Sequence, residues 1–227
     1  MTYFKFIIIM VLLFSGCSTN QGFEGYRYNP FQYPYPEYYL KAETIPISSE
    51  NMKSENNMVQ LEYFGLRSYV QAESFNPKQK DVRENTIIFK DHDKVLVIER
   101  VKDSLIGCDD EQVKNSNKDF CSAFDTSKEY YEKLFTITPQ DLRGANKQII
   151  GNKWIVHRKG FTFENVEKLH KYTGRCFVSF ESIYKSDSNM TKDMILFHDD
   201  TKPYYIVFST NHKDDSFFKK LLETLQE

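Results

Sequence analysis

Short runs of β-branched and aromatic residues, separated by short polar links, dominate the chain after residue 58 and most constrain its fold. The runs at 86–90 and 95–101 flank a tight polar link and predict a hairpin. Neighbouring strands joined by short links must pair antiparallel, so an antiparallel sheet is expected. The segment 165–173 fits helix and strand about equally, and we favour strand. Further strands are predicted at 153–159, 175–185, 194–197 and 204–209.

Helix signals are fewer. Thr126 and Glu129 form a capping-box pattern, and residues 138–141 begin a second short helix that Gly144 can close. Acidic residues at 214–215 suit the positive start of a C-terminal helix. The apolar face of that helix consists of Phe217, Phe218, Leu221, Leu222 and Leu225.

A sheet covered by such helices predicts an α+β fold, with one domain over residues 58–227. The element order loosely resembles the PsbP/Mog1 type of sheet with a closing C-terminal helix, a likeness that carries no function. The composition, 40% hydrophobic and 15% aromatic, is sufficient for a sizeable core. The formal net charge of −2 argues against nucleic acid as a partner.

The start of the chain has the pattern of an export signal. Lys5 precedes nine consecutive apolar residues, Phe6–Phe14. A membrane-spanning helix needs about 20 residues, so this run is too short to span a bilayer.

Ser15-Gly16-Cys17 follows the apolar run and resembles the lipobox of bacterial lipoproteins. Phe14 stands where that family usually has Leu. The resemblance implies removal of residues 1–16, transfer of a diacylglycerol to the Cys17 thiol, and anchoring by fatty acyl chains such as palmitate. The alternative is an ordinary signal peptide followed by an incidental cysteine.

The resemblance also implies a location. In such lipoproteins an Asp after the cysteine favours retention at the inner membrane, and here that residue is Ser18. An outer-membrane lipoprotein that faces the periplasm is therefore expected.

Residues 17–57 are predicted to be the lipid anchor and a tether. They contain many tyrosines together with Pro30, Pro34 and Pro36, a pattern that disfavours a helix or a central strand. A flexible tether of about 40 residues would reach on the order of 35 Å. It is either a spacer whose tyrosines lie against the domain, which we favour, or a segment that binds a partner.

Three cysteines remain beyond Cys17, which permits three pairings. We favour a disulfide between Cys108 and Cys121, because it would order a polar loop that lacks a core of its own. Cys176 alternates with Val178 and Phe180, which predicts a buried, unreactive thiol on a strand.

The common catalytic motifs are absent, and no cofactor is expected. Histidines and aspartates do gather in predicted turns, at His92, His198, Asp199 and His212. Both residue types are zinc ligands, and a metal site would form if these turns met at one end of the sheet. Ordinary turn chemistry is the favoured explanation.

Two function classes follow. The first is a non-catalytic binding lipoprotein that recognises a protein or an envelope component, in an immunity or envelope-associated role. The second is a metal-dependent periplasmic hydrolase that uses the histidine and aspartate turns.

Overall fold

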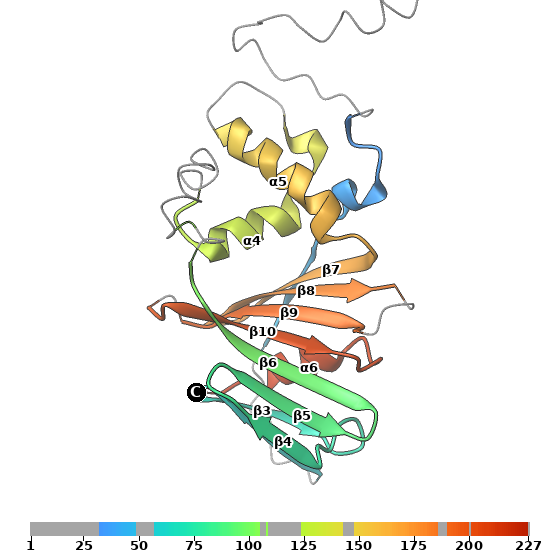
Figure 1. Cartoon of the computed structure of the whole chain (residues 1–227), viewed down its shortest axis with the longest axis vertical. Helices are drawn as coiled ribbons and strands as arrows, with labels where there is room; N and C mark the ends of the chain where they lie inside the picture. The colour runs from blue at the N-terminus through green and yellow to red at the C-terminus, as the bar shows by residue number, and fades with distance from the viewer. Residues whose placement is uncertain are drawn as a thin grey trace, which may run out of the picture.

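The computed structural model describes residues 32–48, 57–104, 108, 124–142, 148–185, 190–199 and 201–226. It has the predicted α+β architecture, with an eight-stranded sheet in the order β1-β7-β8-β9-β10-β6-β5-β4 (Figure 1). The strands of this sheet are β1 (Glu43–Pro46), β4 (Gln79–Val82), β5 (Thr86–Asp91), β6 (Lys94–Lys102), β7 (Val166–Thr173), β8 (Val178–Tyr184), β9 (Lys192–Phe197) and β10 (Tyr204–Thr210). A separate hairpin consists of β2 (Met58–Tyr63) and β3 (Leu66–Gln71).

The pairing follows the expected antiparallel rule except at one edge. The predicted hairpin is formed by β5 and β6, which turn at His92-Asp93, where His92 adopts a positive φ of 55°. The segment 165–173 is a strand, β7, as favoured. At the edge, β1 pairs with β7 in parallel. Parallel pairing needs a long connection, and the stretch of chain between these two strands is long enough to supply it.

The described helices are α4 (Ser127–Thr136), α5 (Gln148–Thr162) and α6 (Phe217–Glu223), with short 3₁₀ turns η3 (Pro36–Tyr39) and η5 (Pro139–Asp141). None of them is long and apolar enough to cross a membrane. The capping pattern before α4 is confirmed, since the Thr126 side chain accepts the Glu129 amide at 3.1 Å. The Glu129 carboxylate accepts a hydrogen bond from the amide of Asp125, one residue before the Thr126 amide that a capping box uses.

The two faces of the sheet carry separate cores. One face packs against α6 and the β2–β3 hairpin, and we call this the hairpin-side core. In it Phe208 of the sheet contacts Tyr63 of the hairpin and Phe218 of α6, with ring centroids 5.3 and 6.0 Å apart. The predicted C-terminal helix is therefore confirmed, although it ends at Glu223, before Leu225.

The opposite face packs against α4, α5 and η3, and we call this the helix-side core. Phe135 of α4 lies 5.1 Å from Phe180 of β8 and 5.0 Å from Phe163, which follows α5. Figure 1 shows α4 and α5 beside the β7 end of the sheet, far from β4.

The strand predicted at 153–159 is wrong, because these residues belong to α5. Ile155, Val156, Lys159 and Phe163 are all buried, at the spacing of one helix face. Seven residues are too few to separate this period from the alternation of a strand.

The aromatic segment is not a tether over its whole predicted length. Residues 32–48 form part of the domain, since β1 extends the sheet and Tyr33 and Tyr38 are buried in the helix-side core. Pro36 sits at the start of η3, where its fixed φ and missing amide hydrogen are tolerated. Of the described tyrosines, Tyr33 and Tyr38 lie against the domain, as favoured, whereas Tyr35 is 60% exposed. The folded region begins well before residue 58.

Candidate binding surface

The outer side of α5 exposes large aromatic side chains. Phe161 has 78% of its area exposed and Trp154 has 39%. The guanidinium carbon of Arg158 lies 5.4 Å from the centre of the Trp154 ring, within the range of a cation–π contact. Exposed rings beside a cation are typical of an interaction surface rather than of a solvated helix.

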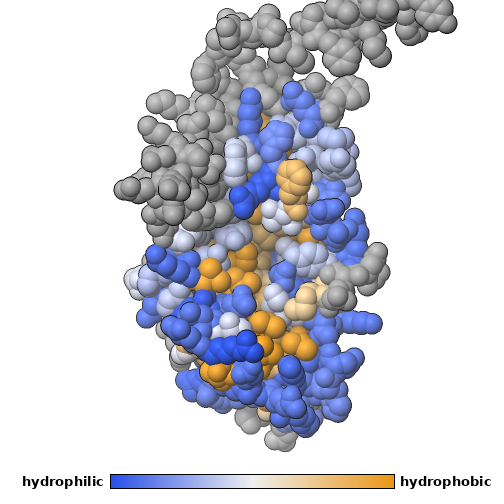
Figure 2. All heavy atoms as spheres, viewed as in Figure 1, coloured by the Kyte–Doolittle hydropathy of each residue, from blue (hydrophilic) through white to orange (hydrophobic). Residues whose placement is uncertain are grey.

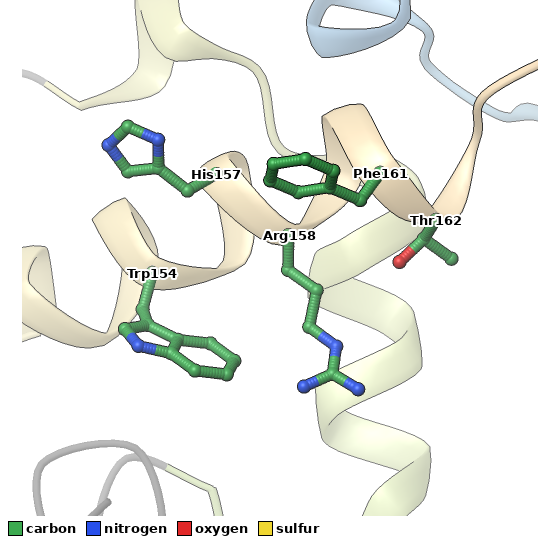
Figure 3. A pocket seen from close by; sticks show the side chains of 5 residues that line it. All are labelled: Trp154, His157, Arg158, Phe161 and Thr162. Carbon is green, nitrogen blue, oxygen red and sulfur yellow. The ribbon is translucent and has the colours of Figure 1, made fainter.

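These side chains line an open hollow of about 460 Å³, together with His157 and Thr162. We call the five residues the α5 surface. In Figure 3, Trp154 and Arg158 extend to one side of the helix, whereas His157 and Phe161 extend to the other. The surface is therefore a shallow depression along one helix, with an apolar and a basic component.

Packing beneath the helix fixes the orientation of the α5 surface. The ring of Tyr33 lies 5.4 Å from that of His157, and Tyr39 donates a hydrogen bond to the Tyr33 carbonyl oxygen at 3.3 Å. Tyr38 lies directly against Gly160, where any side-chain carbon would overlap its ring. The aromatic segment before β1 thus holds α5 from one side.

Lys159 lies on the buried face of α5, behind the exposed rings. The side chain is fully buried, and its ammonium nitrogen donates to the Ile137 carbonyl oxygen at 2.6 Å. Burial lowers the pKa of Lys159 to about 7, although Asp141 acts in the opposite direction. Burial of the Lys159 ammonium lowers the free energy of unfolding, because the charged group loses its hydration. The buried amine is also inaccessible to a substrate.

A polar cluster lies on the other face of the sheet. Glu181 is fully buried, and one of its oxygens accepts from Tyr172 at 2.6 Å and from His170 at 2.7 Å. Burial and the Glu181 carboxylate raise the pKa of the Tyr172 hydroxyl. These contacts join β7 to β8, and sequence patterns do not reveal them because the residues lie on separate strands.

The predicted histidine and aspartate turns do not meet. His92 and His212 follow β5 and β10 at one end of the strands, whereas His198 and Asp199 follow β9 at the other end. Antiparallel neighbours place successive turns at alternating ends, so these turns do not form the metal site that was the less favoured alternative. In the described part of the chain, no group of three or more His, Cys, Asp or Glu residues could hold a metal ion.

His92 and Asp199 have local contacts instead. His92 donates to Asp91 at 2.8 Å, and its side chain is 80% exposed. Asp199 accepts from the hydroxyl and the amide of Thr201, bonds that lower the pKa of Asp199. These are the turn contacts that the sequence favoured.

His212 has a packing role. Its ring stacks on Phe217 with centroids 4.5 Å apart, and its Nε2 donates to the Ser74 carbonyl oxygen at 3.0 Å. Its Nδ1 accepts from the Asp214 amide at 3.2 Å, which fixes the neutral tautomer. Burial lowers the pKa of His212.

Of the four cysteines, Cys108 and Cys176 belong to the described part of the chain. Cys17 and Cys121 lie outside the described residues, so the lipidation and the disulfide stay predictions. Cys108 is half-buried against the helix-side core. Cys176 is exposed in the turn before β8 and is a free thiol, so its predicted burial is wrong. The strand begins three residues later than expected, at Val178.

Searches against protein-family models, curated proteins and solved structures found no match. The candidate surface therefore rests on the residues of this chain alone.

Proposed function

We propose that this chain is an outer-membrane-anchored lipoprotein that faces the periplasm and acts as a non-catalytic binding protein. Its role would be immunity against a delivered toxin or association with the envelope. The lipid on Cys17 supplies the anchor, and the α5 surface supplies the contact with an envelope component.

The exposure of Phe161 and Trp154 on α5, with Arg158 against the Trp154 ring, is the observation that supports this proposal. Large exposed rings, with an arginine against one of them, are typical of a surface that contacts another component of its surroundings. The separation of the histidine turns removes the basis for the metal-dependent hydrolase. The α5 surface is thus the better supported site.

The proposed lipidation of Cys17 is tested by metabolic labelling with a palmitate analogue. The Cys17→Ser variant should lose the label, because the diacylglycerol is attached through a thioether to the sulfur of that cysteine. The Cys176→Ser variant is a matched control, since that thiol is exposed and free, and it should keep the label. Normal labelling of Cys17→Ser would refute the lipoprotein assignment.

The binding role is tested by complementation of a deletion strain. A Trp154→Ser/Phe161→Ser double variant should lose function while it keeps normal protein level and anchoring. Val82→Ser is the matched control, because Val82 is 62% exposed on β4, at the far edge of the sheet. Full complementation by the double variant would assign the binding role to another surface.

A further inference from the structure

The α5 surface has the composition of a helix that lies at a membrane interface. Trp and Phe favour the boundary between headgroups and acyl chains, and basic side chains on the same helix pair with anionic headgroups. Here Trp154 and Phe161 provide the rings, and Arg158 provides the charge. The rings and the basic side chain lie on the exposed side of α5, and the other side of the helix is buried in the helix-side core.

The position of α5 in the molecule brings this surface close to the lipid anchor. About 15 residues separate Cys17 from the first described residue, Gln32. A random-coil chain of that length would span about 20 Å. The next residue, Tyr33, touches His157 of the α5 surface. The anchor therefore leaves the domain beside α5, and Figure 1 shows η3 and α5 together at one end of the molecule.

We propose that the α5 surface docks on the lipid bilayer that holds the anchor and orients the domain relative to the membrane. Phe161 and Trp154 insert at the interface, and Arg158 pairs with an anionic headgroup. The lipid anchor itself is taken from the proposed function. Lipid binding by the surface is a separate property of these side chains.

The size of the surface favours a bilayer over a protein partner. A stable protein interface buries about 800 Å² on each side, whereas the α5 surface offers two exposed rings and one shallow hollow. For an anchored chain, a short tether gives an effective concentration in the mM range, at which weak contacts are sufficient. Two rings and a cation are enough to orient a domain that the acyl chains already hold at the membrane.

The experiment uses the full mature chain with Cys17→Ser, so that the protein carries no lipid. Trp154 is the only tryptophan in the sequence, and its fluorescence therefore reports on the α5 surface alone. Vesicles of phosphatidylglycerol and phosphatidylcholine should shift its emission to the blue. Brominated phosphatidylcholine in the same vesicles should quench it.

Two variants separate the components of binding. Phe161→Ser should lower the partition coefficient at least about fivefold, because the ring supplies apolar burial. Arg158→Gln should weaken binding about fivefold on anionic vesicles and leave binding to pure phosphatidylcholine unchanged. Val82→Ser should match the parent chain, and circular dichroism checks that every variant is folded.

The outcomes distinguish the two proposals. No blue shift and no quenching at mM lipid would overturn membrane docking, whether or not Cys17 is lipidated in cells. A second outcome would be that Phe161→Ser abolishes function in cells although the chain without this substitution does not bind vesicles. That result would show that the α5 surface binds a protein partner, and it would refute membrane docking. Vesicle binding without palmitate labelling would instead refute only the anchor.

Discussion

Lys159 shows how one residue can tie stability to pH. Its pKa is lowered to about 7 in the folded protein from an ordinary 10.5, because the ammonium loses its hydration in the helix-side core. Between these two values the unfolded chain holds the proton and the folded chain does not. Stability from this group is thus fully present above pH 10.5 and is lost as the pH falls toward 7.

We predict that Lys159→Met flattens this pH dependence. In the parent chain the free energy of unfolding should rise with pH by up to about 1.4 kcal/mol per unit in that window. Methionine has a similar shape and no proton to lose, so the slope should fall. Urea denaturation at several pH values measures it, with Lys78→Met as a control at an exposed position. Equal slopes in the parent and Lys159→Met chains would refute the buried neutral amine.

The cysteines give a second prediction at this scale. A non-reducing digest of the exported protein should yield Cys108 and Cys121 in one linked peptide. Their closed loop would contribute roughly 3 kcal/mol, because it limits the unfolded chain. Cys176 should react with maleimide in the same native sample, as an exposed free thiol. Recovery of Cys108 and Cys121 as free thiols would exclude the pairing.

At the scale of elements, the contact between η3 and α5 depends on a glycine. Gly160 leaves room for the Tyr38 ring, and a methyl group there would overlap it. Alanine favours a helix by about 1 kcal/mol relative to glycine. The overlap costs about 1–3 kcal/mol, so the net effect depends on how far Tyr38 must move.

We predict that Gly160→Ala displaces η3 from α5 and lowers the free energy of unfolding. Limited proteolysis should then cut within residues 32–48, and guanidinium denaturation should report the loss of stability. Thr162→Ala is the control, since Thr162 is exposed on the same helix. An alanine variant that is more stable than the parent and equally resistant to protease would show that Tyr38 moves without cost.

For the whole molecule, the N-terminal segment completes both a sheet edge and a core. β1 supplies an edge strand, and the buried Tyr33 and Tyr38 rings close the helix-side core beside α5. Figure 2 shows hydrophilic side chains over most of one face of the molecule, with a strip of apolar side chains down its middle. Removal of the N-terminal segment would expose apolar side chains of the helix-side core to water and enlarge this apolar area.

A truncation tests where the domain begins. A chain that starts at Met58 should be less stable than one that starts at Gln32 by at least about 3 kcal/mol, since it loses two buried rings. Differential scanning calorimetry of both chains gives the comparison. Equal melting temperatures would restore the boundary that the sequence predicted at residue 58.

The sequence by itself determined the local parts of this protein. The β5–β6 hairpin, the α4 cap and the apolar face of α6 each depend on residues that are close in the chain, so their patterns are visible without a structure. Runs of β-branched and aromatic residues joined by short links likewise predicted the antiparallel strands from β7 to β10. Turn chemistry correctly explained His92 and Asp199.

Tertiary structure decided the rest, because the deciding contacts join distant residues. Only packing on the sheet selected helix for 153–159, where a short apolar run is compatible with either period. Only the β1–β7 pairing and the docking of η3 on α5 made the aromatic segment part of the domain. The α5 surface follows from both facts: once one side of the helix is buried, Trp154 and Phe161 must face outward, beside the aromatic segment of residues 32–48.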